Sequence, residues 1–208
     1  MNQPRRLVVA SRNRAKAAEI AQILAEEGLG FKIISLADLP EVVLPTETGE
    51  TFAANAVEKA KAAARATGLP AIADDSGLEV DALGGEPGIR SARYAGEQAG
   101  DADRYRKVLG LMAEVPDGRR GARFRCAAAY AEPEGKVLLA EGACEGRIAQ
   151  RPAGAGGFGY DPIFIPEGCD VTMAQLTPTH KHRISHRGRA FRLLAQMIRE
   201  HLAAHTER

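Results

Sequence analysis

Short apolar runs and longer amphipathic segments alternate along the first third of the chain. The run Leu7–Ala10 predicts a strand, and the apolar positions that follow predict a helix from about Ala15 to Glu27. A second strand is expected at Phe31–Ser35, and an alanine-rich helix from Thr51 to Thr67. An opening of strand, helix, strand, helix and strand indicates an α/β protein.

The second half of the chain adds a helix, a hairpin and a final helix. Asp101–Glu114 is expected to be helical, with Leu111 on its apolar face. The runs Ala122–Ala131 and Lys136–Cys144 flank a turn and predict a β-hairpin. The last helix is expected to start near Ser185.

Two acidic residues follow a predicted buried strand, just after the second predicted helix. The apolar residues Ala71–Ala73 predict a buried strand, and Asp74 and Asp75 follow at once, before a second strand-like run at Leu78–Leu83. Two carboxylates at the end of a buried strand are costly to desolvate unless a positive group such as Mg²⁺ compensates them. The alternative is an ordinary surface turn over residues 74–77. Because successive residues of an extended strand point to opposite faces, the two aspartates cannot play identical roles.

Composition narrows the class of protein. The chain has 208 residues, 45% of them hydrophobic, and a net charge of +1, which argues against a polybasic nucleic-acid or membrane binder. Cys126, Cys144 and Cys169 form no C-x-x-C pair and are expected to be reduced thiols of a cytoplasmic protein. No signal peptide or membrane span is expected. With no repeat or linker, residues 1–208 are expected to form one two-lobed domain.

A first group of residues that could bind a ligand is Ser11-x-Asn13-x-x-Lys16, at a predicted strand-to-helix junction. A helix N-terminus offers backbone N–H groups to a phosphate, and Lys16 adds a positive charge. The alternative is that Ser11 or Asn13 caps the helix and that Lys16 is an ordinary solvated lysine.

A second constellation joins Glu47 to Asp74 and Asp75, with Lys59 on the intervening helix. Carboxylates that hold a metal ion there would neutralise phosphate charge and orient an attacking water. One carboxylate could then accept the proton of that water as a general base. Lys59 could contact a phosphate or a carboxylate, although a helix lysine is often only solvated.

The third constellation is the glycine-rich segment Gly154–Asp161. Glycines let a backbone approach a flat ligand closely, and Phe158 or Tyr160 could stack on a base; the alternative is a flexible turn before a strand. The segment matches neither a Walker phosphate loop nor a Rossmann fingerprint. A zinc site built from the later histidines is disfavoured, because no cysteine accompanies them. The cationic side chains that could complete the segment are Lys181, His186 and Arg187.

The three constellations predict a phosphate-binding end, a metal centre and a place for a flat ring. Together they indicate that the ligand is a nucleoside polyphosphate. The chain resembles the inosine triphosphate pyrophosphatase family. The resemblance runs through nearly the whole chain, in the order SRNRAK, ETGETFAANAVEKA, AIADDSGLEVDALGGEPGIRSARYAG, GGFGYDPIF and SHRGRAF.

The resemblance implies Mg²⁺-dependent hydrolysis of ITP, dITP and XTP to the monophosphate and pyrophosphate, which removes deaminated purines from the nucleotide pool. It implies an elongated mixed β-sheet flanked by helices, in two lobes with the active site in the cleft between them. It also implies a homodimer that binds small-molecule purine triphosphates. Two alternatives are a sensor that binds a nucleotide without hydrolysis and a phosphohydrolase that releases orthophosphate.

Carried over position by position, the resemblance implies that Asp75 is the proton acceptor and a metal contact, with Glu47 as the other metal ligand. Thr46 stands where some members have a further acidic residue. The substrate contacts that it implies are Ser11, Arg12, Asn13, Arg14, Ala15, Lys16 and Lys59 toward the phosphates, Ser76, and Phe158, Gly159, Tyr160, Asp161, Lys181, His186 and Arg187 toward the base and ribose.

Overall fold

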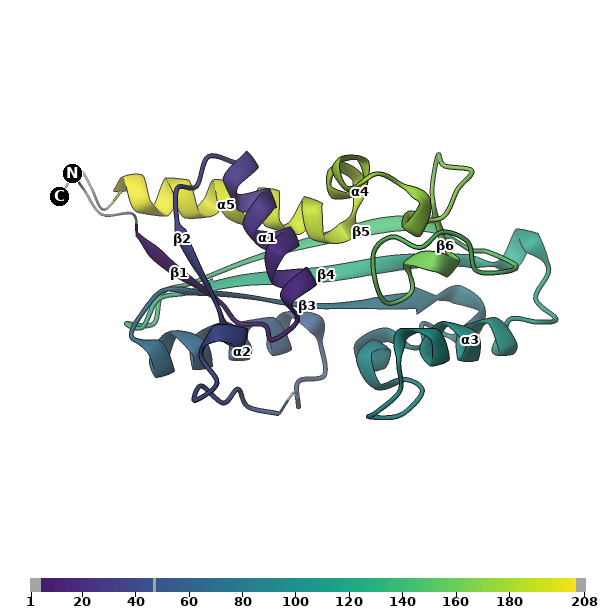
Figure 1. Ribbon diagram of the computed structural model, residues 1–208, viewed down its shortest axis with the longest axis horizontal. Helices are drawn as coiled ribbons and strands as arrows, with labels where there is room; N and C mark the ends of the chain where they lie inside the picture. The colour runs from purple at the N-terminus through teal and green to yellow at the C-terminus, as the bar shows by residue number, and fades with distance from the viewer. Residues whose placement is uncertain (1–4, 47, 205–208) are drawn as a thin grey trace. The chain divides into compact units, whose positions relative to one another are not determined.

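A computed structural model describes residues 5–46 and 48–204 (Figure 1). Within these ranges the strands form a six-stranded sheet in the order β2-β1-β3-β4-β5-β6. The strands are β1 (Arg6–Val9), β2 (Lys32–Ser35), β3 (Ala71–Val80), β4 (Gly121–Ala131), β5 (Val137–Ile148) and β6 (Phe164–Pro166). The helices are α1 (Arg14–Glu26), α2 (Phe52–Thr67), α3 (Asp101–Leu111), α4 (Pro178–Ile184) and α5 (His186–Ala204).

The sheet is mixed, which confirms the α/β class and the mixed sheet that the resemblance implies. β1 pairs in parallel with both β2 and β3, whereas β5 and β6 pair antiparallel. β4 and β5 are neighbours joined by a tight turn, in which the Glu132 amide donates to the Lys136 carbonyl, so the predicted hairpin is confirmed. No helix in the described part of the chain combines the length and apolar character needed to cross a bilayer.

The chain divides into two compact units, each described by itself. The first unit takes in Met1–Asp75, Cys126–Gly142 and Arg187–Arg208, and the second takes in Ser76–Arg125 and Ala143–His186. The boundaries fall inside β3, β4 and β5, so these strands contribute residues to both units. The expectation of one two-lobed domain over residues 1–208 stays a prediction.

The core of the first unit follows from the two-residue period of its strands. Leu7 and Val9 pack in one cluster with residues of α1 and α5, whereas Val8 packs in another with the alanines of α2. Figure 1 accordingly shows α1 and α5 on one face of β1 and α2 on the other. Helices on both faces explain why these strands read as unbroken apolar runs. α2 ends at Gly68, whose left-handed conformation (φ 65°) glycine adopts at little cost.

Local structure differs from the sequence predictions in three places. The turn considered for residues 74–77 is absent from the described structure, because β3 continues through them to Val80. Leu111 is 52% exposed and lies outside the core of the second unit, which instead contains Val108 and Met112. The short helix α4 was not expected, because its polar sequence lacks apolar periodicity; Thr177 caps it by accepting from the His180 amide.

The second unit has a core of its own. Leu78 and Val80 of β3 pack there with Phe124 of β4 and Ile148 of β5, and with Phe164 of β6. Burial of these apolar residues stabilises the part of β3 that follows its two aspartates. Cys126, Cys144 and Cys169 form no disulfide in the described part of the chain.

Candidate active site

The predicted phosphate-contacting residues of the first unit lie in the loop between β1 and α1, in the first turn of α1 and on α2. Asn13 caps α1, because its Oδ1 accepts from the Lys16 amide at 3.1 Å. Ser11 Oγ accepts from the Asn13 amide at 3.2 Å. Both side chains therefore order the helix N-terminus, where backbone N–H groups and the helix dipole favour an anion.

Charged side chains of this loop and of the first turn of α1 differ in their surroundings. Lys16 is not a freely solvated lysine, since its side chain is only 20% exposed and Nζ lies 3.2 Å from Asp74 Oδ1. Arg12 donates to the Val42 carbonyl at 2.7 Å, and the exposed Arg14 pairs with Asp38 at 3.1 Å. Ala15 lies in the first turn of α1.

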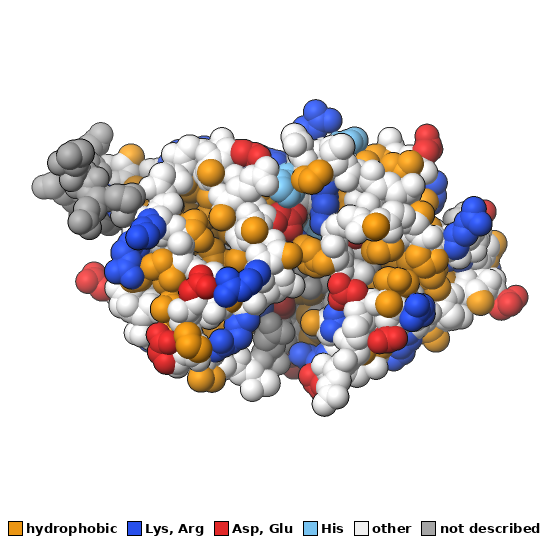
Figure 2. All heavy atoms as spheres, viewed as in Figure 1, with side chains coloured by type: hydrophobic (Ala, Val, Ile, Leu, Met, Phe, Trp, Pro, Cys, Tyr) orange, Lys and Arg blue, Asp and Glu red, His pale blue; other side chains and the backbone are white. Residues whose placement is uncertain are grey.

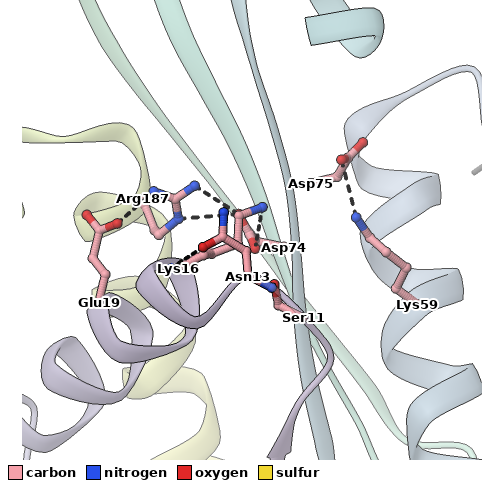
Figure 3. A network of polar contacts seen from close by, with 8 residues as sticks. All are labelled: Ser11, Asn13, Lys16, Glu19, Lys59, Asp74, Asp75 and Arg187. Atoms are coloured by element: carbon pink, nitrogen blue, oxygen red, sulfur yellow. Dashed lines mark hydrogen bonds and ion pairs between the residues drawn. The ribbon is translucent and has the colours of Figure 1, made fainter. Parts of the chain in front are cut away.

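Asp74 lies at the centre of a buried chain of alternating charges (Figure 3). Its Oδ1 contacts Lys16, and its Oδ2 accepts from Nε and Nη2 of Arg187, both at 3.3 Å. Nη1 of Arg187 donates to Glu19 Oε2 at 2.8 Å. Two carboxylates thus face two cations, and pairing of this kind is what buried charges require.

Asp75 points away from Asp74, toward α2. Lys59 Nζ lies 3.3 Å from its Oδ1, and Asn55 Nδ2 donates to its Oδ2 at 2.9 Å. Asn55 is itself fixed, because its Oδ1 accepts from the Gly49 amide at 2.8 Å. The two aspartates therefore have different partners on opposite faces of β3, as alternation along a strand predicts (Figure 3).

Two residues of this group were missed by sequence reasoning. Glu19 is buried on α1 and faces the same side as Ile20 and Ile23, so a charge at an apolar position was the available signal. Asn55 is almost fully buried on α2, where an asparagine in an alanine-rich helix gave a weaker signal of the same kind.

The described residues fit Mg²⁺ through one carboxylate. Glu47, the other predicted ligand, lies outside the described residues. Among those described, no three His, Cys, Asp or Glu side chains gather as a metal cluster. Asp74 contacts Lys16 and Arg187, whereas Asp75 contacts Lys59 and Asn55, and the two oxygens of a carboxylate suit a hard cation that retains water ligands.

The second unit brings together Phe158, Asp161 and Lys181. Asp161 is almost fully buried, and its Oδ2 accepts from Lys181 Nζ at 2.7 Å and from the Phe158 amide at 2.9 Å. Lys181 Nζ also lies 4.8 Å from the centroid of the Phe158 ring, a cation–π distance. One lysine thus links the buried carboxylate to a partly exposed aromatic ring.

Close backbone approach explains the glycines of this segment. Gly157 has φ +73°, and a Cβ there would lie 2.0 Å from Asp161 Oδ2. Any larger residue would therefore displace the carboxylate that binds Lys181.

Of the two aromatic rings predicted to meet a base, Phe158 is partly exposed and Tyr160 is buried in the core of the second unit. Tyr160 Oη donates to the Ser91 carbonyl at 2.9 Å. Burial raises the pKa of Tyr160 well above its usual value, so the phenol stays protonated. Phe158 is accordingly the ring that a flat ligand can reach.

The remaining predicted residues lie where the chain passes between the units. Ser76 is half-buried in β3 and directly follows Asp75 in the sequence. His186 is buried in the second unit and stacks on Phe124, with 4.6 Å between ring centroids. Arg187, the next residue, belongs to the first unit and to the network of Asp74 described above. The predicted site residues thus form two groups, one in each unit.

Comparison with known proteins gives one consistent result. A model of the Ham1 family matches residues 7–197. A dITP/XTP pyrophosphatase of Streptomyces coelicolor is 50% identical over 195 residues, which cover 94% of this chain and 98% of that protein. A dITP/XTP pyrophosphatase of Nocardia farcinica is 51% identical over 190 residues, covering 91% and 92%.

Solved structures agree with the sequence relatives. A HAM1 protein from Coxiella burnetii has a TM-score of 0.84 and 43% identity, covering 94% of this chain and 99% of that one. A nucleoside-triphosphatase, dITP/XTP pyrophosphatase, from Mycobacterium abscessus has a TM-score of 0.72 and 46% identity, covering 91% and 98%. The chain therefore belongs to the Ham1 family.

Proposed function

We propose that this chain hydrolyses the deaminated purine nucleoside triphosphates ITP, dITP and XTP to the monophosphate and pyrophosphate. One observation carries the proposal: relatives named dITP/XTP pyrophosphatase share about half of their residues with it over nearly their whole length. The proposed role is to remove deaminated purines from the nucleotide pool of the cytoplasm.

Asp75 is the residue proposed to accept a proton. A water oxygen forms a bond to the α-phosphorus as the bond from that phosphorus to the bridging oxygen breaks, and pyrophosphate leaves. Asp75 takes the proton of that water, and its orientation is supported by Asn55 and Lys59, which contact its two oxygens. Asp75 and Glu47 would hold Mg²⁺, which supplies neutralisation of phosphate charge when bound.

The α1 N-terminus is proposed to bind the phosphates. Lys16 would contribute its charge there, and Asp74 positions its ammonium group at 3.2 Å. Neutralisation of phosphate charge by a helix N-terminus and a lysine lowers the energy of the transition state as negative charge moves to the leaving pyrophosphate.

The purine is proposed to stack on Phe158, with Lys181 and Asp161 holding the segment. Hypoxanthine and xanthine have a 6-oxo acceptor where adenine has an amino donor, so His186, Arg187 or a backbone N–H would favour the oxo form. A buried hydrogen-bond donor or acceptor that is left without a partner costs about 1–3 kcal/mol of binding free energy. If Arg187→Ala leaves the preference for ITP over ATP unchanged, the role of Arg187 in this choice is wrong.

Pyrophosphate release from ITP, XTP, GTP and ATP tests the function, with Mg²⁺ and with a chelator. Mg²⁺-dependent pyrophosphate from ITP and XTP is expected, and Asp75→Asn should reduce kcat by about 10²–10⁴-fold. Asp38→Asn, at an exposed ion pair, is the matched control. ITP binding without turnover would instead indicate a sensor, and orthophosphate release would indicate a different phosphohydrolase.

A homodimer and the absence of nucleic-acid and membrane partners complete the proposal. On the face drawn in Figure 2, basic and acidic side chains are interspersed, which supports a small-molecule substrate over a polyanionic partner. Light scattering during size-exclusion chromatography measures the mass, and a value of one chain would contradict the dimer.

A further inference from the structure

The amide of Gly159 is held by a residue that sequence reasoning did not select. Asp101, the first residue of α3, accepts from the Gly159 amide through Oδ2 at 2.7 Å. Its other oxygen, Oδ1, accepts from Arg104 Nη1, also at 2.7 Å. Arg104 is fixed in turn, because Nη2 donates to the Ala99 carbonyl at 2.6 Å. The carboxylate that meets Gly159 is therefore held at both oxygens.

This contact orients the peptide plane next to the Phe158 ring. The Gly159 N–H and the Phe158 carbonyl belong to one planar peptide unit, so a donor fixed on Asp101 also fixes the backbone that carries the ring. On either side, the Phe158 amide is bound by Asp161 and the Tyr160 hydroxyl by Ser91. Asp101 thus supplies the middle of three successive anchors.

An ordinary role in starting α3 does not account for the contact. Acidic residues in the first turn of a helix stabilise its N-terminus, and α3 has two of them, Asp101 and Asp103. Asp103 has the local role, since its Oδ2 accepts from the Gly100 amide at 3.1 Å. Asp101 instead reaches a segment 58 positions later in the chain. Asp101 can therefore be tested against Asp103, which serves as a matched control in the same helical turn.

We propose that Asp101 is a positioning residue for recognition of the purine, acting through the Gly159 amide on the Phe158 ring. The proposal rests on the proposed function, because it takes the glycine-rich segment as the base-binding part of the site. It predicts that Asp101 affects binding of the base and leaves the phosphate contacts and the hydrolytic step unchanged.

Steady-state kinetics of the full chain with ITP test the proposal, with inorganic tripolyphosphate as an inhibitor that has phosphates and no base. Asp101→Ala should raise KM for ITP about tenfold, with kcat and the Ki of tripolyphosphate within about twofold of the starting protein. Asp101→Asn keeps an acceptor for Gly159 and loses the charge that pairs with Arg104, so its KM should rise only about threefold. Asp103→Ala should leave KM unchanged.

Other outcomes overturn the proposal. An unchanged KM in Asp101→Ala would exclude a positioning role, and a parallel rise in KM for ITP and Ki for tripolyphosphate would indicate general damage. If Asp101→Ala does not fold, Asp101→Asn decides by the same comparison with Asp103→Ala. Absence of pyrophosphate from ITP in the unmodified chain would overturn the proposed function itself, whereas an active chain with an unaltered variant overturns only the inference.

Discussion

Asp74 and Asp75 are consecutive residues of β3 whose carboxylates bind cations on opposite faces of that strand (Figure 3). Asp74 meets Lys16 and Arg187, and Asp75 meets Lys59. This arrangement separates a structural carboxylate, matched by two cations, from one that is proposed to do chemistry. Their substitutions should therefore have different effects.

Asp74→Ala is expected to destabilise the fold. The substitution leaves the partly exposed Lys16 and the buried Arg187 with one fewer carboxylate, and breaking a buried ion pair on one side costs about 3–5 kcal/mol in the free energy of unfolding. Urea denaturation measures the loss. Asp38→Ala is the control, because its pair with Arg14 is exposed and should contribute less than about 1 kcal/mol. Equal losses in the two variants would contradict a structural role for Asp74.

Asn55→Ala is expected to lower kcat while leaving the fold intact. Asn55 donates to Asp75 Oδ2, so its removal frees the proposed base to rotate; loss of such a supporting contact typically costs about 10–100-fold in activity. ITP hydrolysis and thermal unfolding measure the two effects separately. Gln22→Ala, which removes an exposed contact to Glu26, is the control. A normal kcat would show that Asp75 does not need the hydrogen bond from Asn55.

Gly157→Ala is expected to damage the glycine-rich segment. The new Cβ would lie 2.0 Å from Asp161 Oδ2, at a positive φ that alanine rarely adopts, so the contact between Asp161 and Lys181 should break. KM for ITP should rise at least about tenfold. Gly135→Ala is the control, since its φ is also positive and its Cβ would meet nothing within 4 Å. Similar kinetics in the two variants would contradict the importance of the close approach.

Alkaline pH is expected to destabilise the first unit through Tyr130. Burial, followed by the hydrogen bond to Glu132, raises the pKa of Tyr130 above its usual value of 10.0. Below that value both states keep the proton. Above it the unfolded chain loses the proton first, so the free energy of unfolding falls with rising pH by about 1.4 kcal/mol per unit for this group. In urea titrations from about pH 9 to 11, Tyr130→Phe should show a shallower fall, and an equal slope would contradict the assignment.

Much of the fold followed from the sequence, because its signals are local. The apolar run of β1, the caps of α1 and α2 and the tight turn after β4 each depend on a few adjacent residues. The extent of β3 could not be predicted in this way. Its continuation past Asp75 depends on burial of Leu78 and Val80 in the second unit and on cations from α1, α2 and α5, which are far away in the sequence.

Residues of the candidate site show the same difference between local sequence signals and partners that are distant in the sequence. Lys16, Asp75 and Phe158 stand in dense polar or glycine-rich blocks, so the sequence singles them out. Asn55 and Asp101 stand in ordinary helical contexts, and their importance comes from partners 20 and 58 positions away. Such partners become visible only when the chain is folded.

The alternation in β3 also limits how this stretch of the chain can change in length during evolution. A single codon inserted between Ile72 and Asp74 would turn both carboxylates to the opposite faces of β3, so that Asp74 would face α2, Asp75 would face α1, and neither would keep its present partners. Gains and losses of residues should therefore collect elsewhere, for example at the hairpin tip around Gly135. Ile72–Asp75 should keep its length wherever the two aspartates are retained.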